Sequence, residues 1–391
     1  IYMKIAIIGH KRIPSNEGGI EKCVEQHAVR MAALGHKVYV YNRGGDNVFG
    51  KKYNKKRLKS YKGVRIITVP AGNKKAGVII YSFLATIHAA FMRYDVVSYC
   101  ASGPCAAIRL AKIFKIRCIA SLHGIDSKRD KWGGFAKKYL EFGEKTAAKK
   151  ADVCMVLSQN MKDYIDKRYN ADSLLFANGI DKPKKRKARI IKNKYGIDKD
   201  SYILSLGRIV PEKGIHYLIN AFKKCDTDKK LIIAGGAEAD REYYNSLKRA
   251  GADDMRIKFI GYITGDEIGE LYSNAYIFTL PSNLEGMANT LLESMSYGCC
   301  CLVSDIPENT EVVKDKAACF KKSDEEDLYK KLQHLLDNPD IVEDYKSTAA
   351  DYVLKRYNWD IAVDQLLRVF KGERVTYMEV LKEYEDRLLH K

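Results

Sequence analysis

The 391-residue sequence lacks any stretch that qualifies as a membrane-spanning helix. The nearest candidate is residues 76–92, a 17-residue apolar segment that includes Ser82, Thr86 and His88. A membrane span needs about 20 predominantly apolar residues, so this segment is predicted to be a buried helix. We expect no signal peptide either, because the given sequence begins with a strand-like run, IYMKIAIIGH. We therefore expect a cytoplasmic protein.

Metal-binding patterns are absent as well. The ten cysteines are scattered, mostly inside apolar runs, and none has the spacing of a metal site. Such residues are typical of buried free thiols in a reducing compartment. No Asp-x-Asp pair is placed to bind a cation. We therefore expect neither a metal ion nor another cofactor.

Acidic residues are scarce in the first half of the chain. Residues 1–194 contain 41 basic and 14 acidic residues, whereas the remainder contains 27 basic and 35 acidic ones. All of the net charge of +19 therefore belongs to residues 1–194. Two stretches, 51–65 and 181–194, concentrate the basic residues. This excess predicts an anionic partner, namely a membrane surface, a phosphate-bearing lipid or nucleic acid, unless it is only a solvated lysine-rich surface.

Nucleic acid is the least favoured of these partners. No segment has the pattern of a nucleic-acid reader, and only Tyr53 and Tyr61 are interleaved with the basic runs. An anionic membrane surface fits better, since a cluster of cations could lie at one edge of the first domain: Lys51, Lys52, Lys55, Lys56, Arg57 and Lys59. We therefore expect no nucleic-acid partner and a peripheral association with the membrane.

Strand-like and helix-like segments alternate along the chain, as in a doubly wound α/β fold. The length favours two domains. Residues 1–182 are predicted to form the first domain, residues 183–195 a basic linker, and residues 196–373 the second domain. A final helix at about 374–391 could pack back on the first domain.

Residues 281–313 read as a loop, a helix, a glycine stop and a strand. Glu285 falls where the loop meets the helix, and Glu293 follows about two turns later. The backbone N–H groups of residues 286–290 would lie at a helix N-terminus, which favours anions. Carboxylates beside an anion site suit hydroxyl groups, so the pattern suggests a ligand with both phosphates and hydroxyls, such as a nucleotide sugar. The alternative is an ordinary capped helix with glutamates on its solvent face.

Three other loops carry candidate ligand-binding residues. Residues 202–214 form a strand ending at Gly207 and Arg208, and Lys213 precedes the next helix; two such cations can clamp a diphosphate. Gly18 and Gly19 open a helix and allow close approach of a ligand to the backbone. The polar loop with His123 and Asp126 follows a strand, at the sheet edge where open α/β sheets bind ligands.

These motifs together resemble a known enzyme family over nearly the whole chain. Glu285 and Glu293, with seven residues between them within EGM…LLESMSYG, resemble the glutamate pair of retaining glycosyltransferases with the GT-B fold. That family includes sucrose synthase and bacterial mannosyl- and rhamnosyltransferases. The Gly-Arg…Lys-Gly motif at 207–214 matches it in the expected order. The segments PSNEGGIE and HGIDSKRDKWG resemble its rhamnosyltransferase-like subgroup, which synthesises surface polysaccharides.

The resemblance implies two Rossmann-like domains that face each other across a cleft, the first for the acceptor and the second for the donor. It implies that Glu285 contacts the donor sugar, that Glu293 contacts the ribose, and that Arg208 and Lys213 hold the phosphates. His123, with Asp126 in the same loop, would lie near the reacting sugar. The remaining donor-binding residues that it implies are Gly18, Gly19, Gly207, Tyr262, Ile263, Gly286, Met287, Ala288, Asn289 and Thr290.

The implied reaction moves a sugar, with a preference for rhamnose, from a nucleoside-diphosphate sugar with retention at the anomeric carbon. The acceptor would be a saccharide or a polyprenyl-diphosphate-linked saccharide at the inner face of the cell membrane. The Arg208–Lys213 pair would replace a metal ion on the leaving diphosphate. A non-hydrolysing nucleotide-sugar epimerase shares this architecture and is the alternative, although it normally lacks the glutamate pair.

Overall fold

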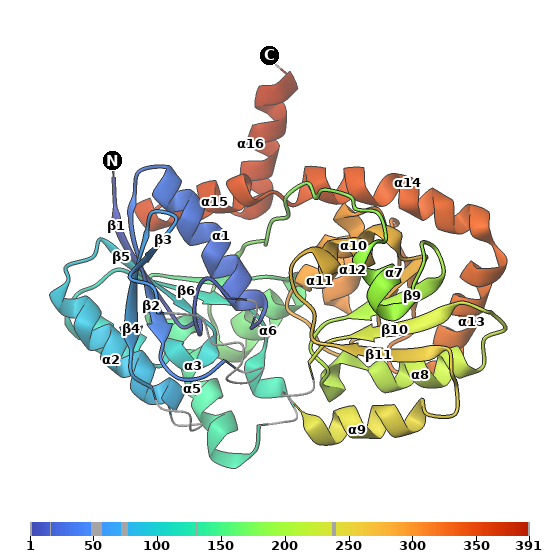
Figure 1. Cartoon of the computed structure of the whole chain (residues 1–391). Coiled ribbons are helices and arrows are strands. Elements are labelled where there is room, and N and C mark those ends of the chain that lie inside the picture. The colour runs from blue at the N-terminus through green and yellow to red at the C-terminus, as the bar shows by residue number, and fades with distance from the viewer. Residues whose placement is uncertain are drawn as a thin grey trace. The chain divides into compact units, whose positions relative to one another are not determined.

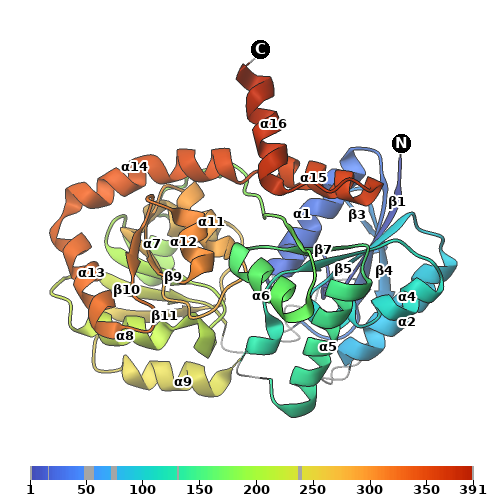
Figure 2. The same ribbon diagram turned by 180° about the vertical axis from the view of Figure 1, so that it is seen from behind.

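The structure, a computed structural model, describes residues 2–15, 17–47, 57–71, 77–129, 132–236 and 240–389. The chain divides into two compact units (Figure 1, and from behind in Figure 2). The first comprises residues 1–179 and 359–391, and the second comprises residues 180–358. Each unit is a Rossmann-like α/β domain around a parallel sheet, which confirms the predicted fold class.

The first unit is built on an eight-stranded sheet with the order β3-β4-β2-β1-β5-β6-β7-β8. All neighbouring strands are parallel except β3 and β4. The strands are β1 (Lys4–Ile8), β2 (Lys37–Arg43), β3 (Ser60–Tyr61), β4 (Val64–Val69), β5 (Val96–Cys100), β6 (Cys118–Leu122), β7 (Val153–Val156) and β8 (Leu174–Leu175). Strands β5, β6 and β7 are buried along their whole length, because helices cover both faces of the sheet.

The chain passes from β1 to β2 on one side and later enters β5 on the other side of β1. This reversal places α1 (Gly19–Ala33) on one face of the sheet and α2 (Gly77–Phe91) on the opposite face (Figure 1). The other helical segments are α3 (Ser102–Cys105), α4 (Ile108–Ile113), η2 (Asp126–Lys128), α5 (Gly134–Lys150) and α6 (Gln159–Tyr169). Helices α3 and α4 are short and are joined by a turn at residues 106 and 107.

Two carboxy-terminal helices, α15 (Trp359–Lys371) and α16 (Tyr377–Leu389), belong to the first unit. The sequence assigned residues up to 373 to the second domain, and that boundary is wrong for α15. Its Trp359 is buried and lies edge-on to His27 of α1, with ring centroids 5.4 Å apart. Arg117 also donates hydrogen bonds of 3.1 and 3.0 Å to the carbonyl oxygens of Phe370 and Val369. The apolar face of α15 therefore completes the core of the first unit.

The second unit has a six-stranded sheet with the order β11-β10-β9-β12-β13-β14, parallel throughout. Its strands are β9 (Tyr202–Leu206), β10 (Lys230–Ala234), β11 (Ile257–Gly261), β12 (Ile277–Leu280), β13 (Cys300–Ser304) and β14 (Ala318–Phe320). The chain runs from β9 outward to β11 and then returns to β12 on the other side of β9. This reversal between β9 and β12 is the topological switch point, where open α/β sheets bind ligands.

Helices cover both faces of this sheet as well. They are α7 (Ile190–Tyr195), η3 (Pro211–Lys213), α8 (Ile215–Lys223), α9 (Arg241–Ala250), α10 (Asp266–Asn274), α11 (Asn289–Ser296), α12 (Pro307–Val313), α13 (Glu325–Asp337) and α14 (Pro339–Arg356). Ile219 and Phe222 of α8, Leu231 of β10 and Leu332 of α13 are buried in one hydrophobic core. This core fixes the strands whose carboxyl ends carry the predicted donor residues.

The predicted linker, residues 183–195, packs on the second unit. The N–H groups of Arg189, Ile190 and Ile191 donate to one carboxylate oxygen of Glu270, at 2.9, 2.7 and 3.1 Å. Arg186 also pairs with Asp266 at 2.8 Å. Acidic side chains of α10 therefore hold this basic segment.

The other basic stretch is described only in part. Arg57 and Lys59 are exposed, and the structure does not describe Lys51, Lys52, Lys55 and Lys56.

Candidate active site

The loops that follow β9 and β12 lie against each other at the switch point of the second unit. The strands are neighbours, with Ile277 opposite Ile203 and Phe278 opposite Leu204. Beyond them, Asn283 N–H donates to the carbonyl oxygen of Glu212 at 2.8 Å. A Cβ atom at Gly214, where φ is +65°, would lie 2.0 Å from the carbonyl oxygen of Pro281. The contact therefore requires glycine, and it brings the two motifs at 207–214 and 281–293 together.

Glu285 is fixed by both loops. Its Oε1 accepts a hydrogen bond of 2.6 Å from Ser282 Oγ and forms an ion pair with Lys213 Nζ. The Lys213 and Glu285 side chains are only 17% and 9% exposed, so water screens this pair weakly. Both contacts use Oε1, and Oε2 has no partner among the residues that the structure describes. The carboxylate is thus held in place while one oxygen stays available to accept from a hydroxyl group.

Arg208 lies at the same switch point, directly after Gly207. Gly207 N–H continues the sheet by donating to Ala234 at 3.0 Å, and Arg208 follows at the strand end. The Arg208 side chain is half-buried and has no ion pair or hydrogen bond within the described ranges. Guanidinium groups bind phosphate with two parallel hydrogen bonds. A half-buried guanidinium that has no ion pair within the described residues, five residues before Lys213 at the end of β9, suits a diphosphate.

The turn Gly286–Ala288 leads into α11, which begins at Asn289 rather than directly after Glu285. The N-cap residue, Ala288, makes no side-chain cap, and the first N–H groups of the helix lie next to the loop that contains Glu285. Glu293 lies in the second turn and accepts a hydrogen bond of 3.0 Å from Tyr272 Oη. Burial, together with the nearby Glu293 charge, raises the pKa of Tyr272 well above its ordinary value, so the phenol remains a donor. Asn289 and Thr290 form the first turn of the helix.

Tyr262 and Ile263 follow β11, at the same edge of the sheet but two strands away from β9. Gly235 N–H donates to Gly261 at 2.9 Å and anchors the start of this loop beside β10. Ile263 is buried and Tyr262 is half-buried. The Tyr262 side chain is therefore the part of this loop that a planar ligand could contact.

The predicted residues of the first unit gather at its own switch point, between β1 and β5. A Cβ atom at Gly9, where φ is +120°, would lie 2.1 Å from the carbonyl oxygen of Cys100. Gly18 precedes α1, and Lys11 N–H donates to Glu21 Oε1 at 3.0 Å. Burial alone would raise the pKa of Glu21, but the Lys11 charge and backbone hydrogen bonds outweigh it and lower the pKa. The Gly18–Gly19 loop therefore encloses a buried carboxylate.

His123 follows β6, and Asp126 lies in η2 just beyond it. Asp126 Oδ1 lies 3.3 Å from Arg129 Nε, and the loop is anchored by Ser127, whose Oγ donates to Glu144 at 3.1 Å. Burial lowers the pKa of His123 to about 4, with Asp126 and Glu21 opposing this shift. His123 is therefore a neutral imidazole at neutral pH.

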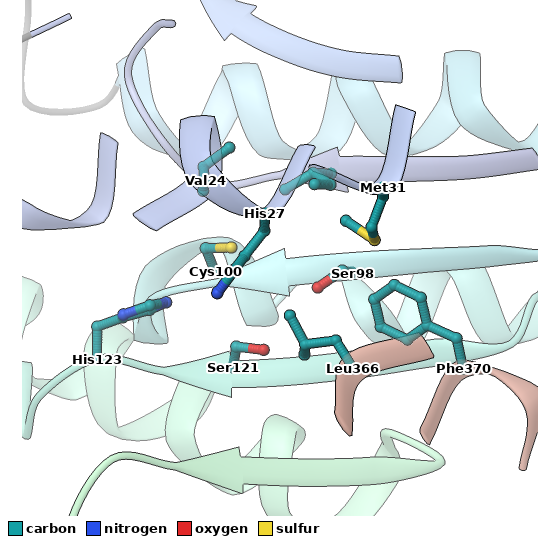
Figure 3. Close-up of a pocket in the computed structure, with 10 residues that line it drawn as sticks. Val24, His27, Met31, Ser98, Cys100, Ser121, His123, Leu366 and Phe370 are labelled. Carbon is teal, nitrogen blue, oxygen red and sulfur yellow. The ribbon is translucent and has the colours of Figure 1, made fainter. Parts of the chain in front are cut away.

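A cavity of about 10 Å³ lies behind His123, inside the first unit (Figure 3). Its lining comes from α1, from β1, β5 and β6, and from α15, and it includes Ser98 and Ser121. His27 of α1 points into this space, and its Nε2 has no hydrogen-bond partner among the described residues. The space suffices for about one water molecule. His27 and His123 line the same cavity, which therefore lies between α1 and the predicted catalytic loop.

The buried histidines predict an acid-sensitive first unit. Burial lowers the pKa of His10 and His123 to about 4 and that of His27 to about 3. An unfolded histidine takes up a proton near pH 6.5, so stability is fully present above that pH and falls as the pH drops towards 4. Within this window, each buried histidine lowers the free energy of unfolding by roughly 1.4 kcal/mol for each unit that the pH falls.

The test is urea unfolding at pH 7 and pH 5, followed by tryptophan fluorescence. Both tryptophans, Trp132 and Trp359, belong to the first unit, so their emission reports on it alone. The His27→Gln variant should lose stability at pH 7 but show a shallower dependence on pH. Equal stability of the unmodified protein at both pH values would contradict the prediction.

Sequence reasoning missed two groups that position the glutamates. Ser282 stands three residues before Glu285, and a serine at that spacing is a recognisable partner for a glutamate in a turn. Tyr272, which binds Glu293, comes from α10 and carries no signal in the sequence. No group of three metal-ligating side chains and no helix fit to span a bilayer occurs in the part of the chain that the structure describes.

Comparison with known proteins shows which families share these motifs. Residues 187–373 match the family model described as glycosyl transferases group 1, and residues 17–182 match that described as glycosyltransferase family 4. Together the two matches leave out only residues 1–16, 183–186 and 374–391. The chain is thus a glycosyltransferase of the group 1 and family 4 type. The glutamate pair and the Arg208–Lys213 motif of this glycosyltransferase both lie within the group 1 match.

Individual relatives agree with this family. The O-antigen chain mannosyltransferase RfbU of Salmonella typhimurium is 28% identical over 222 residues, which are 55% of this chain and 60% of the relative. The match thus spans less than two thirds of that relative. The structure of sucrose-phosphate synthase from Thermosynechococcus elongatus is 18% identical, with a TM-score of 0.81, over 94% of this chain and 98% of the synthase.

A second solved structure is Alr3699/HepE of Anabaena in complex with UDP and glucose. It is 16% identical to this glycosyltransferase, with a TM-score of 0.79, and the alignment covers 95% of this chain and 100% of HepE. These structural likenesses establish the GT-B fold. The comparisons do not favour the epimerase that was the alternative.

Proposed function

We propose that the protein transfers a sugar from a nucleoside-diphosphate sugar to a saccharide acceptor, with retention at the anomeric carbon. The arrangement at the switch point between β9 and β12 is the observation that carries this proposal. It combines Arg208, which has no ion pair within the described residues, with the Lys213–Glu285 ion pair and the start of α11, whose N-cap residue makes no side-chain cap. Cations and amides of this kind bind a diphosphate, and a carboxylate beside them binds sugar hydroxyls.

The proposed step breaks the bond between the anomeric carbon and the diphosphate oxygen and forms a bond to an acceptor hydroxyl oxygen on the same face. The proton of that hydroxyl passes to the leaving diphosphate. Arg208 and Lys213 stabilise the negative charge that grows on the diphosphate, as preorganised charges do in a site sheltered from water. This pair would serve in place of a metal ion.

The resemblance supplies the remaining proposed donor contacts. Glu285 Oε2 would accept from hydroxyls of the donor sugar, while Gly286–Thr290 would supply amides to the sugar and the diphosphate. Glu293, oriented by Tyr272, would accept from the ribose hydroxyls. Tyr262 and Ile263 would contact the base. His123 and Asp126, with the Gly18–Gly19 loop, would serve the reacting sugar from the first unit.

The acceptor and the sugar are proposed from the relatives and the sequence motifs. The relatives include an O-antigen chain mannosyltransferase and the serotype-specific mannosyltransferase WbdA of Escherichia coli, whereas PSNEGGIE and HGIDSKRDKWG resemble rhamnosyltransferases. Mannose and rhamnose are therefore the two donor sugars that we propose. The acceptor would be a growing surface polysaccharide, carried on a polyprenyl diphosphate at the membrane.

A donor screen tests the function. The protein is titrated with UDP-glucose, GDP-mannose and dTDP-rhamnose, and each donor is then assayed for transfer to a lipid-linked saccharide. We expect one nucleotide to bind well above the others and the product to keep the anomeric configuration of the donor. The same assay in EDTA should proceed at an undiminished rate. Inverted product, or activity lost in EDTA and restored by magnesium or manganese, would overturn the mechanism.

A further inference from the structure

Helix α2 exposes an apolar face. Its sequence, GVIIYSFLATIHAAF, contains no Asp, Glu, Lys or Arg. Ile80, Leu84, Ile87 and Phe91 are 53%, 44%, 41% and 77% exposed. Their spacing of four, three and four residues puts them on one stripe, and the opposite stripe packs on the sheet through Tyr81 and other buried side chains. An ordinary surface helix has polar residues on its outer stripe. The exposed apolar stripe of α2 therefore indicates contact with an apolar environment other than the sheet.

The apolar surface continues over α4 and α5, which lie on the same face of the sheet (Figure 2). Ile113 and Phe114 at the end of α4, and Phe135 and Phe142 of α5, are all exposed. The Arg109 guanidinium of α4 lies 4.8 Å from the centre of the Phe142 ring. We call these eight apolar residues on α2, α4 and α5 the outer apolar face.

The helices that carry this face are contiguous. A Cβ atom placed on Gly103 of α3 would touch Val78 of α2 at 3.8 Å and Leu140 of α5 at 3.7 Å. Tyr139 of α5 also donates to the Gly103 carbonyl oxygen at 3.0 Å. Of the fifteen large hydrophobic residues that are exposed in the described parts of the chain, eight belong to the outer apolar face. Single exposed hydrophobics are ordinary, but a contiguous patch marks an interaction surface.

Positive charge surrounds the outer apolar face. Exposed cations on or beside its helices have no ion pair within the described residues: Arg93, Arg109, Lys115, Lys137, Lys138 and Lys145. Helices α2, α3 and α4 contain no acidic residue. The two glutamates of α5 are both engaged, since Glu141 pairs with Arg168 at 2.9 Å and Glu144 is buried. The surface is therefore apolar in its middle and uncompensated positive around it.

We propose that the outer apolar face docks the protein on a lipid bilayer that contains anionic phospholipid. The apolar side chains would enter the boundary between headgroups and acyl chains, while the surrounding cations contact lipid phosphates. A protein partner would need about one hydrogen bond per 100–200 Å² of interface, and the exposed residues of α2 offer only His88 for this. A bilayer requires no hydrogen bonds from the side chains that insert into it.

This inference rests on the proposed function in one respect, because a membrane-docked first unit would meet a lipid-linked acceptor where it resides. It also places the membrane contact elsewhere than the sequence analysis does. The sequence analysis expected this contact at residues 51–59, whereas the proposal places it on α2, α4 and α5, where exposed apolar side chains are accompanied by cations.

Vesicle flotation tests the proposal. The full chain is mixed with vesicles of phosphatidylcholine alone, or of equal parts phosphatidylcholine and phosphatidylglycerol, at low and high salt. We expect strong binding to the anionic vesicles and weak binding to the neutral ones. High salt should weaken the anionic binding only in part, because charges are screened but inserted apolar side chains are not. Equal, negligible binding to both vesicles at low salt would overturn the proposal.

Variants locate the surface. Leu84→Gln with Phe91→Gln should reduce partitioning onto anionic vesicles at least tenfold. Lys137→Glu with Lys138→Glu should reduce it by about fivefold or more per lysine, since each cation near an anionic surface contributes ~1 kcal/mol. The matched controls change exposed residues of the second unit, Met255→Gln and the pair Lys248→Glu with Lys331→Glu, and should bind as the unmodified protein does.

Two further measurements separate the explanations. Binding of nucleoside diphosphates in solution should be the same in all these variants, so a protein that docks on vesicles but binds no nucleotide would defeat the proposed function and leave the docking face standing. Light scattering of the unmodified and Leu84→Gln/Phe91→Gln proteins reports self-association. If the variant dissociates a dimer and binds vesicles undiminished, the face joins two copies of the chain and the membrane proposal is wrong.

Discussion

Arg208→Ala is expected to weaken the binding of a nucleoside diphosphate roughly 10- to 150-fold, because a hydrogen bond to a charged group contributes about 1.5–3 kcal/mol. The side chain has no ion pair or hydrogen bond with any residue that the structure describes, so its loss should leave the stability of the second unit almost unchanged. Calorimetric titration with UDP, GDP and dTDP measures the effect.

Two variants serve as controls for Arg208→Ala. Arg249→Ala removes an exposed arginine from α9 of the same unit and should leave the affinity unchanged. Lys213→Met should weaken binding and also destabilise the unit, because the mostly buried Glu285 carboxylate would lose its cation. If Arg208→Ala bound the preferred diphosphate as tightly as the unmodified protein, Arg208 would have no place in the donor site.

Glu285→Gln should lower kcat by about a hundredfold or more while nucleoside-diphosphate affinity changes little, in line with the 10²–10³ that one preorganised polar group supplies. The amide can still accept from Ser282, so the loop should keep its shape. The charge that faces Lys213 and the donor sugar is lost. Single-turnover kinetics at saturating donor, together with titration of the free nucleotide, separate the two effects.

Glu293→Gln is the matched comparison, since it makes the same change eight residues along, on α11. Glu293 accepts a hydrogen bond from Tyr272, and it is proposed to bind ribose. It should therefore weaken every donor of one nucleotide alike. Should Glu293→Gln discriminate between sugars while free nucleotide binds normally, the roles of the two glutamates would have to be exchanged.

Several residues of the candidate donor site could be located from the sequence because they follow strand ends. Gly207 and Arg208 follow β9, Glu285 follows β12, and parallel strands bring their carboxyl ends to one edge. The residue patterns alone, however, could not pair Lys213 with Glu285. That contact depends on β9 and β12 being neighbours, which is a property of strand order and not of local sequence.

Other features could not be predicted because they depend on packing between distant segments. Nothing in the sequence of α15 indicates that Trp359 packs against His27 of α1 and so places this helix in the first unit. Likewise, the apolar run at 76–92 predicted a buried helix. Only the structure shows that the sheet covers one stripe of α2 and leaves Ile80, Leu84, Ile87 and Phe91 exposed.

The most direct test of the central claim is a crystal structure of the protein with its preferred nucleoside diphosphate bound. The account predicts that the diphosphate oxygens lie within hydrogen-bond distance of Arg208 and Lys213 and of amides between Gly286 and Thr290. The ribose hydroxyls should reach Glu293. A diphosphate bound elsewhere, with Arg208 and Lys213 facing solvent, would contradict the account.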